Sequence, residues 1–272
     1  MLIPHRHPLR RAVFQARYDR FIAELSLDGR SIEAHCVNPG RMEGLVRPGT
    51  PAWVSEVAPE SPRKLRYTLE LLKPKGRYVG VNTNMPNYLA ECLLRARQVP
   101  GLKRYREIRR EVPYGDRSRI DFLLSQGNRY HYLEVKNCHL VYPDGGAYFP
   151  DSVSSRAARH LEELGHMINQ GHKASVLFTV QRNDAHFIRP SDMHDPKFAA
   201  AARAAHQHGV RFLAACFEPS LRGFRFLGLR PVYLGHYSYE PLKRYRDARL
   251  PFSGWIRRGT STTAKSRPVR KS

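Results

Sequence analysis

The stretch RIDFLLSQGNRYHYLEVKN, residues 119–137, decides the fold of the second half of the chain. Two apolar runs are separated by the polar turn QGN at positions 126–128, which is the pattern of a β-hairpin. Side chains two apart in a strand point to the same face, so Glu134 and Lys136 are expected side by side. The hairpin also brings Asp121, in its first strand, near that face. The stretch therefore predicts two carboxylates and a lysine at one edge of a sheet.

Two converging carboxylates predict a site for a hard divalent cation. Mg²⁺ takes few protein carboxylates and keeps waters and substrate oxygens as its other ligands, so we expect Asp121 and Glu134 to bind Mg²⁺ or Mn²⁺. Lys136 would orient or help to deprotonate an attacking water, or offset charge on a pentavalent phosphorus centre. The alternative is that Glu134 and Lys136 form an exposed ion pair, as a Glu-x-Lys pair normally does. The core-like runs FLL and YHYL beside the two acids favour the metal site.

The charge of the chain indicates its partners. The sequence holds 46 Lys and Arg against 24 Asp and Glu, a formal charge of +22, which attracts nucleic acid, an anionic membrane surface or an acidic protein. Residues 95–119 hold nine basic and three acidic side chains, and residues 243–272 hold ten and one. Residues 1–11 form a third basic segment, an N-terminal arm. Three such segments favour nucleic acid over a set of merely solvated faces.

The cellular setting follows from what the sequence lacks. Its apolar runs all fall short of the roughly 18 residues that a transmembrane helix needs, so we expect no membrane partner. The N-terminus MLIPHRHPLRRAVF has no apolar segment typical of a signal peptide. The four cysteines are scattered without a CxxC pair, which indicates reduced thiols in a cytoplasmic protein. The sequence gives no indication of the oligomeric state.

The first half of the chain has the pattern of a small β-barrel. Between residues 12 and 83, short apolar runs alternate with turn signals such as the Asp-Gly pair at 28–29. Five or six short strands of this kind predict a small barrel domain. An oligonucleotide-binding (OB) barrel fits, although periodicity alone does not distinguish it from another small β fold.

The second half, residues 84–240, predicts an α/β domain. Its elements alternate between helical periodicity and buried strands, so we expect a mixed sheet flanked by helices. The predicted helices are residues 87–98, 154–170 and 195–208, and the predicted strands are residues 106–113, 119–125, 130–137, 174–180 and 210–217. Residues 241–272 are expected to form a flexible basic tail.

Several segments together resemble one known family. RIDFLL, YLEVKN, AYFPDSVSSRAARHLEEL and VLFTVQRNDAHFIRP in the second half, and HCVNPGRMEGL and VNTNMPN before them, are similar to the sugar fermentation stimulation protein family. The resemblance runs in order over roughly residues 12–235. It implies an N-terminal OB-type barrel and a C-terminal domain similar to restriction endonucleases of the PD-(D/E)xK type. It also implies DNA binding and a link to the regulation of sugar use.

The resemblance assigns roles to residues of the hairpin. Asp121 matches the first acid of the PD-(D/E)xK motif, Glu134 the second, and Lys136 the lysine. Gln181, at the end of a strand, matches the polar residue often found beside the metal in such folds. The family usually has Ser after the lysine, and this chain has Asn137, which leaves the metal-site prediction intact.

Five further residues are candidate nucleic-acid contacts. Arg156 and His160 lie four apart at the start of a predicted helix, so both can face a phosphate, although a solvated helix face is the alternative. Arg182 follows a buried strand, where polar residues often line sites. Arg41 lies in a Gly-Pro loop of the barrel, and Arg119 begins the hairpin.

Three functions are compatible with these features. The first is a DNA-binding protein with a Mg²⁺-dependent nuclease site. The second is a non-catalytic DNA-binding regulator that keeps a nuclease scaffold, and the third is an RNA-processing factor. A regulator has no chemical need for Asp121, Glu134 and Lys136 together, so their joint presence favours the first.

Overall fold

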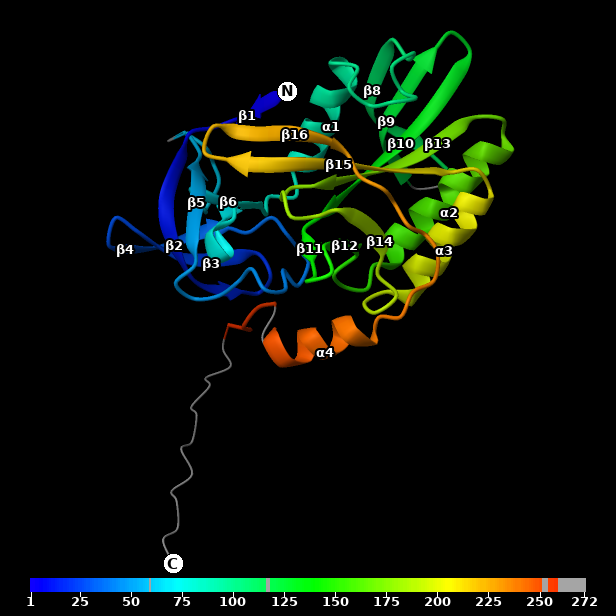
Figure 1. Cartoon of the computed structure of the whole chain (residues 1–272). Coiled ribbons are helices and arrows are strands. Elements are labelled where there is room, and N and C mark those ends of the chain that lie inside the picture. The colour runs from blue at the N-terminus through cyan, green and yellow to red at the C-terminus, as the bar shows by residue number, and fades with distance from the viewer. Residues whose placement is uncertain (59, 116–117, 251–253, 259–272) are drawn as a thin grey trace, which may run out of the picture.

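The computed structural model describes residues 1–58, 60–115, 118–250 and 254–258, which form a barrel packed against a larger sheet with helices on both faces (Figure 1). The barrel strands run in the order β4-β3-β2-β5-β6, and β4 also pairs with β6, which closes five strands. They are β2 (Leu9–Tyr18), β3 (Ile22–Leu27), β4 (Arg30–His35), β5 (Pro51–Glu56) and β6 (Tyr67–Leu72). The predicted small barrel is therefore confirmed.

Alternation of side chains explains why these residues close into a barrel. Phe14, Leu25 and Leu69 point inward and are at most 1% exposed, while polar neighbours point to solvent. The hairpin between β3 and β4 turns at Asp28 and Gly29, whose φ angles are 50° and 77°. A turn with two positive φ angles matches the twist of the strands and is typical of Asp-Gly. Beyond β6, the short turn η1 (Pro74–Gly76) and β7 (Val79–Gly80) complete this half.

A seven-stranded mixed sheet organises the second half. Its order is β1-β16-β15-β13-β10-β9-β8, with β10, β13 and β15 parallel and the other pairs antiparallel. The hairpin predicted from residues 119–137 is the β9–β10 pair. The strands are β1 (Leu2–Pro4), β8 (Glu107–Tyr114), β9 (Ser118–Gln126), β10 (Arg129–Cys138), β13 (Lys173–Val180), β15 (Arg211–Ser220) and β16 (Gly223–Leu229).

Helices cover both faces of this sheet, as predicted. On one face lie α2 (Ser155–Asn169) and α3 (Pro196–Gln207), and on the other lies α1 (Met85–Arg95) (Figure 1). The N-cap side chains of α2 and α3, Ser154 and Asp195, accept hydrogen bonds from the first turn of each helix. A small second sheet contains β11 (Leu140–Val141), β12 (Gly146–Phe149) and β14 (Phe187–Pro190). None of the helices in the described residues is long and apolar enough to cross a bilayer.

The barrel and the large sheet share a hydrophobic core. Trp53 and Leu71 of the barrel pack into the cluster formed by α1 and one face of the sheet, with Leu89 and Leu177. A separate cluster fills the space between the sheet and the helices α2 and α3. Because apolar side chains join the two halves, the barrel is fixed against the sheet rather than tethered by a linker.

The two ends of the chain differ from their expected form. The arm expected over residues 1–11 contains β1, which pairs with β16 at the edge of the large sheet, and β2 starts at Leu9. The flexible tail expected over residues 241–272 begins instead with α4 (Glu240–Arg249). Residues 259–272 of that tail lie outside the described residues. β1 has only three residues and α4 has a single buried one, which is why hydrophobic periodicity does not reveal them.

Candidate active site

The acid Asp121 of β9 is held in place by two hydrogen bonds. Its Oδ2 accepts from the backbone N–H of Val135 at 2.7 Å, which ties β9 to β10. Its Oδ1 accepts from Asn87 Nδ2 of α1 at 2.8 Å. Because each oxygen accepts one hydrogen bond and a carboxylate oxygen has two lone pairs, both oxygens keep capacity for another partner. Asn87, which lies in the VNTNMPN segment, is not among the site residues predicted from the sequence.

The acid Glu134 faces α2 and has one satisfied and one unsatisfied oxygen. Its Oε1 accepts from Lys136 Nζ and from His160 Nδ1, both at 2.5 Å. Arg156 Nε lies 3.3 Å from His160 Nε2, a contact that fits the tautomer with the proton on Nδ1. The other oxygen of Glu134, Oε2, is buried and has no hydrogen-bond partner. A buried polar atom without a partner is costly and marks a place where a water or an ion belongs.

The two acids differ in their electrostatics. Burial and the nearby charge of Glu134 raise the pKa of Asp121 to about 6, against its two hydrogen bonds. Burial alone would also raise the pKa of Glu134, but the charge of Lys136 and the hydrogen bond from His160 outweigh it and lower that pKa. Two carboxylates in one low-dielectric site disfavour double ionisation. A cation between them would remove that repulsion.

The donor set of this site fits Mg²⁺ or Mn²⁺. Asp121 and Glu134 offer oxygen ligands, and Oε2 of Glu134 is free to take part. Among the described residues, no group of three or more His, Cys, Asp and Glu side chains is placed to hold a metal ion. The protein thus offers two carboxylates, which suits a cation that keeps waters and substrate oxygens as its remaining ligands.

Gln181 and Arg182 lie close to this strand end but serve other contacts. Gln181 is fully buried, and its Nε2 donates to Asn137 Oδ1 at 2.7 Å. Its side chain packs on Gly80 of the barrel, where an added Cβ would lie 2.5 Å from Gln181 Oε1. Arg182 donates to both oxygens of Asp184 and to the carbonyl of His139. Within the described residues, neither side chain has a recorded contact with Asp121 or Glu134.

Arg41 and Arg119 are exposed. The Arg41 side chain is 52% exposed and lies 3.8 Å from Glu43, and Arg119 reaches the carbonyl of Glu111 at 3.4 Å. The structure thus brings together Asp121, Glu134, Lys136, His160 and Arg156 and leaves the other predicted residues outside this group. The roles of all of them remain predictions.

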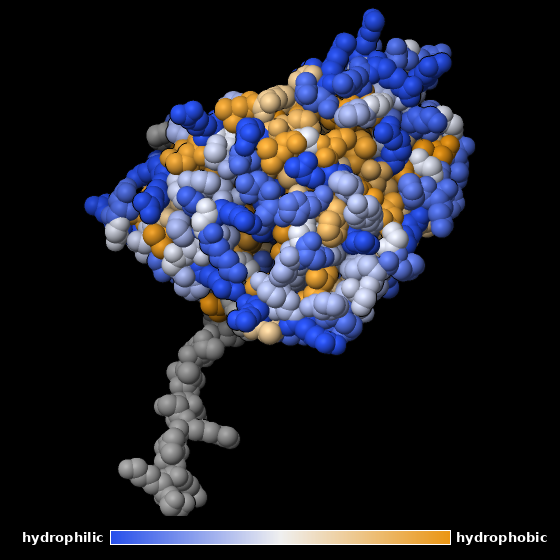
Figure 2. Space-filling model, viewed as in Figure 1, coloured by the Kyte–Doolittle hydropathy of each residue, from blue (hydrophilic) through white to orange (hydrophobic). Residues whose placement is uncertain are grey.

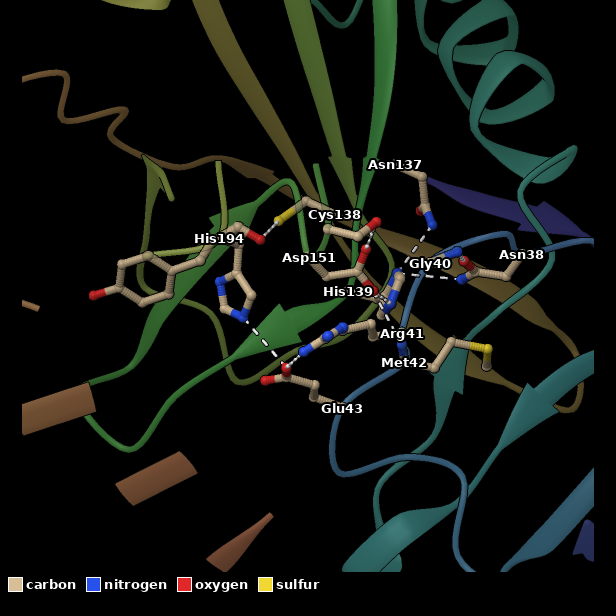
Figure 3. A network of polar contacts seen from close by, with 12 residues as sticks. Asn38, Gly40, Arg41, Met42, Glu43, Asn137, Cys138, His139, Asp151 and His194 are labelled. Atoms are coloured by element: carbon tan, nitrogen blue, oxygen red, sulfur yellow. Dashed lines mark hydrogen bonds and ion pairs between the residues drawn. The ribbon is translucent and has the colours of Figure 1, made fainter. Parts of the chain in front are cut away.

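A second buried polar network joins the barrel to the sheet (Figure 3). Asp151 lies at its centre, where Oδ2 accepts from the backbone N–H of Met42 at 3.0 Å and lies 3.2 Å from His139 Nε2. Asn38 of the barrel and Asn137 of β10 both approach His139 Nδ1, at 3.4 and 3.3 Å. Gly40 passes so close to Asp151 that any Cβ would collide with the carboxylate. The NPG loop of the barrel is therefore shaped to fit this acid.

A second acid in this network is also paired with a histidine. Glu43 Oε1 lies 3.3 Å from His194 Nε2, and Oε2 accepts from Tyr142 at 2.8 Å. Burial would raise both acids' pKa values, but the histidine contacts outweigh it, lowering the pKa of Asp151 to about 2 and that of Glu43 as well. Both acids are therefore ionised and satisfied, which is the pattern of a structural joint.

Comparison with known proteins matches both halves of the chain. The family model of the sugar fermentation stimulation protein RE domain matches residues 84–223, and that of the SfsA N-terminal OB domain matches residues 16–81. Sugar fermentation stimulation protein homologs are among the relatives. The one from Thioalkalivibrio sulfidiphilus is 44% identical over 73% of this chain and 84% of its own. The one from Caulobacter vibrioides is 43% identical over 83% of this chain and 94% of its own.

A solved structure is also similar over most of the chain. It is that of Pyrococcus furiosus SfsA in complex with Ca²⁺, with a TM-score of 0.78 and 26% identity. The match covers 85% of this chain and 98% of that one. The barrel is thus of the OB type, and the second half is of the RE type.

Proposed function

This chain belongs to the sugar fermentation stimulation protein family, and we propose that it binds DNA and hydrolyses phosphodiester bonds at Asp121, Glu134 and Lys136. One observation carries the proposal: the buried, unpartnered Oε2 of Glu134 in a site that also holds Asp121 and Lys136. An open buried oxygen is a place for a water or an ion, and beside a second carboxylate and a lysine it suits a metal ligand.

The family comparisons support the same proposal. An OB domain and a net charge of +22 suit a nucleic-acid partner. The similar Pyrococcus furiosus protein was solved with Ca²⁺, a hard cation that prefers oxygen ligands as Mg²⁺ does. A divalent cation bound by Asp121 and Glu134 would polarise a phosphoryl oxygen and lower the pKa of a bound water.

The residues of this chain supply the remaining tasks. Lys136 Nζ lies against Glu134 and can also donate to a water or to a phosphate oxygen. His160 holds Glu134 from α2, with Arg156 behind it. Asn87 and the Val135 amide hold Asp121. Fixed donors of this kind keep the acids in place, so little reorganisation is needed when charge develops on the phosphate.

The direct test is cleavage of end-labelled single- and double-stranded DNA and RNA with Mg²⁺ or Mn²⁺, read on a denaturing gel. We expect metal-dependent fragments from the wild type and none from Lys136→Ala. A native gel should show that this variant binds within roughly tenfold of wild type, about 1.4 kcal/mol. Lys103→Ala, an exposed lysine of the same half, is the matched control and should cleave normally.

Each other outcome of this experiment has a defined meaning. Nucleic acid that is shifted but uncut in every lane would contradict the nuclease and favour a regulator that only binds. Cleavage confined to RNA would favour a processing factor. Loss of binding and cleavage together in Lys136→Ala would make Lys136 a phosphate anchor.

A further inference from the structure

A hollow of about 670 Å³ lies between the barrel, the loop after β13 and α4. Figure 2 shows a recess left of centre with hydrophilic side chains around it, in the region between the barrel and β11 of Figure 1. Pockets of roughly 300–1,000 Å³ hold a compact ligand, so the hollow has room for a short segment of a flexible chain rather than for a duplex. The residues that define it here are Arg47, Lys75, Arg77, Arg182, His186 and Tyr245.

The hollow is lined by cations that are only partly neutralised. Arg77 and Arg182 share one acid, Asp184, whose pKa they hold below its usual value although burial would raise it. Arg47 donates to the carbonyl of Arg249, a neutral group. Within the described residues, Lys75 has no recorded ion pair or hydrogen bond. The positive charge of the lining therefore exceeds what the acids beside it can balance.

The backbone around Lys75 holds it in an uncommon conformation. Lys75 lies in the turn η1 with φ 50° and ψ 36°, the left-handed region, inside the Pro74–Gly76 segment. A residue other than glycine is strained in this region, and such residues are concentrated at functional sites. The turn is closed by the hydrogen bond from Arg77 N to Pro74 O at 3.1 Å. The barrel thus presents this lysine at a fixed position of the rim.

An aromatic side chain completes the lining. Tyr245 of α4 is half-buried and meets the ring of the buried Tyr142 edge-on, with the ring centroids 6.2 Å apart. Basic side chains along a groove with an aromatic ring on which a base can stack are the two components of single-strand binding. The helix α4 lies beyond residue 223, where the match to the family's second domain ends.

We propose that this hollow binds a short segment of single-stranded nucleic acid, with phosphates at Arg47, Lys75 and Arg77 and a base on Tyr245. The path of the strand from the hollow toward the acids rests on the proposed function. Arg182, in the lining, donates to the carbonyl of His139, the residue that follows β10, so the hollow lies next to the C-terminal end of the strand that carries Glu134 and Lys136. Binding at the hollow is nevertheless measurable without any cleavage.

The test measures the fluorescence anisotropy of a labelled oligothymidine with the full chain in metal-free buffer, over a series of salt concentrations. Lys75→Ala should weaken binding and reduce the slope of log affinity against log salt by about 0.7, the release of one counterion from a single strand. Tyr245→Ala should weaken binding roughly 5- to 150-fold with an unchanged slope, and Tyr245→Phe should restore it. Lys64→Ala, an exposed barrel lysine outside the hollow, is the matched control and should leave affinity and slope unchanged.

Three results would overturn the inference. Equal effects of Lys64→Ala and Lys75→Ala would show general charge attraction, and an unchanged affinity in Tyr245→Ala would remove the stacking contact. Tighter binding of a blunt duplex than of the oligothymidine would exclude a single-strand site. The thermal unfolding temperature of each variant must match that of the wild type, so that a loss of binding comes from the changed surface and not from unfolding. If the Lys75 and Tyr245 effects appear while no variant ever cleaves, the hollow stands and the nuclease proposal fails.

Discussion

Two sets of buried acids in this molecule have similar partners but differ in their hydrogen bonding. At the candidate metal site on β9 and β10, Glu134 is paired with a histidine and a lysine, and Asp121 lies beside it. At the joint between barrel and sheet, Asp151 is paired with His139, and Glu43 with its own histidine. The side chains of Glu134 and Glu43 are 4% and 1% exposed, so burial does not distinguish the two sets.

What distinguishes them is whether the carboxylate oxygens have partners. Both acids of the joint have lowered pKa values and partners on their oxygens, as Figure 3 shows for the pairs with His139 and His194. At the candidate metal site, Asp121 has a raised pKa and one oxygen of Glu134 has no partner. A satisfied buried acid supports the fold, whereas an unsatisfied one costs stability and needs another role. Substitutions can test this contrast directly.

The largest effect is expected from removing the central acid of the joint. Asp151→Ala leaves His139 and the Met42 amide without their buried partner, which should cost about 3–5 kcal/mol of unfolding free energy. Chemical denaturation measures this loss of unfolding free energy. Asp247→Ala removes an acid of an exposed ion pair in α4 and should cost less than about 1 kcal/mol. A similar small cost for both would contradict the structural role of Asp151.

The next effect separates the two sets by their response to metal. Mn²⁺ at about 100 times its Kd should stabilise the wild type by about 2.7 kcal/mol. Asp121→Asn should abolish this gain, and Asp151→Asn, although less stable, should keep it. Calorimetric titration measures the Kd for Mn²⁺, and thermal unfolding with and without Mn²⁺ measures the stabilisation. Equal gains in both variants would place the metal elsewhere.

A smaller effect concerns acid stability. The pKa of Asp151 is about 2 when folded, against an ordinary 3.8, so its stabilising contribution is present above pH 4 and is lost as the pH falls from 4 to 2. The loss amounts to about 2 kcal/mol. Unfolding free energies of wild type and Asp151→Asn, measured across this range, should therefore converge toward low pH. Parallel curves would show that the acid is not strongly ionised in the fold.

The smallest effect has the opposite sign. Asp121 has a raised pKa, so its ionisation opposes folding as the pH rises through 4 to 6, and Asp121→Asn removes that cost. The substitution also weakens one hydrogen bond, so the unfolding free energy should rise by about 1 kcal/mol at pH 7 without metal. This corresponds to a Tm about 2–4 °C higher. A Tm lowered as in the Asp151 variants would mean that both sets are structural.

The sequence predicts those parts of the molecule that depend on local pattern. The β9–β10 hairpin follows from two apolar runs around a turn, and the closeness of Glu134 and Lys136 follows from strand periodicity. The strands of the small second sheet contain only two to four residues, too few for a period to appear. The helix α4 has a single buried residue, Leu242, and therefore no apolar stripe.

The rest of the site depends on contacts between distant segments. Asn87 reaches Asp121 across 34 positions, and Asn38 reaches His139 across 101. Such contacts follow from how α1 and the barrel pack on the sheet, and no local pattern encodes them. For the same reason Gln181 and Arg182, which follow β13, the neighbour of β10 in the sheet, make their contacts with the barrel side and with Asp184.

The pairing of β1 with β16 has a consequence for biosynthesis. Leu2–Pro4 completes the edge of a sheet whose partner strand ends at Leu229, and Gly223, with φ 144°, leaves space for Ile3 that any Cβ would block. Because the ribosome adds roughly 5–20 residues per second, β16 is synthesised on the order of ten to forty seconds after β1. Near the other end, Ile256 bonds back to the barrel at Arg17 and Asp19. Each half therefore holds a segment from the opposite end of the chain. A second half expressed alone would expose the bare edge of β16 to association with other chains.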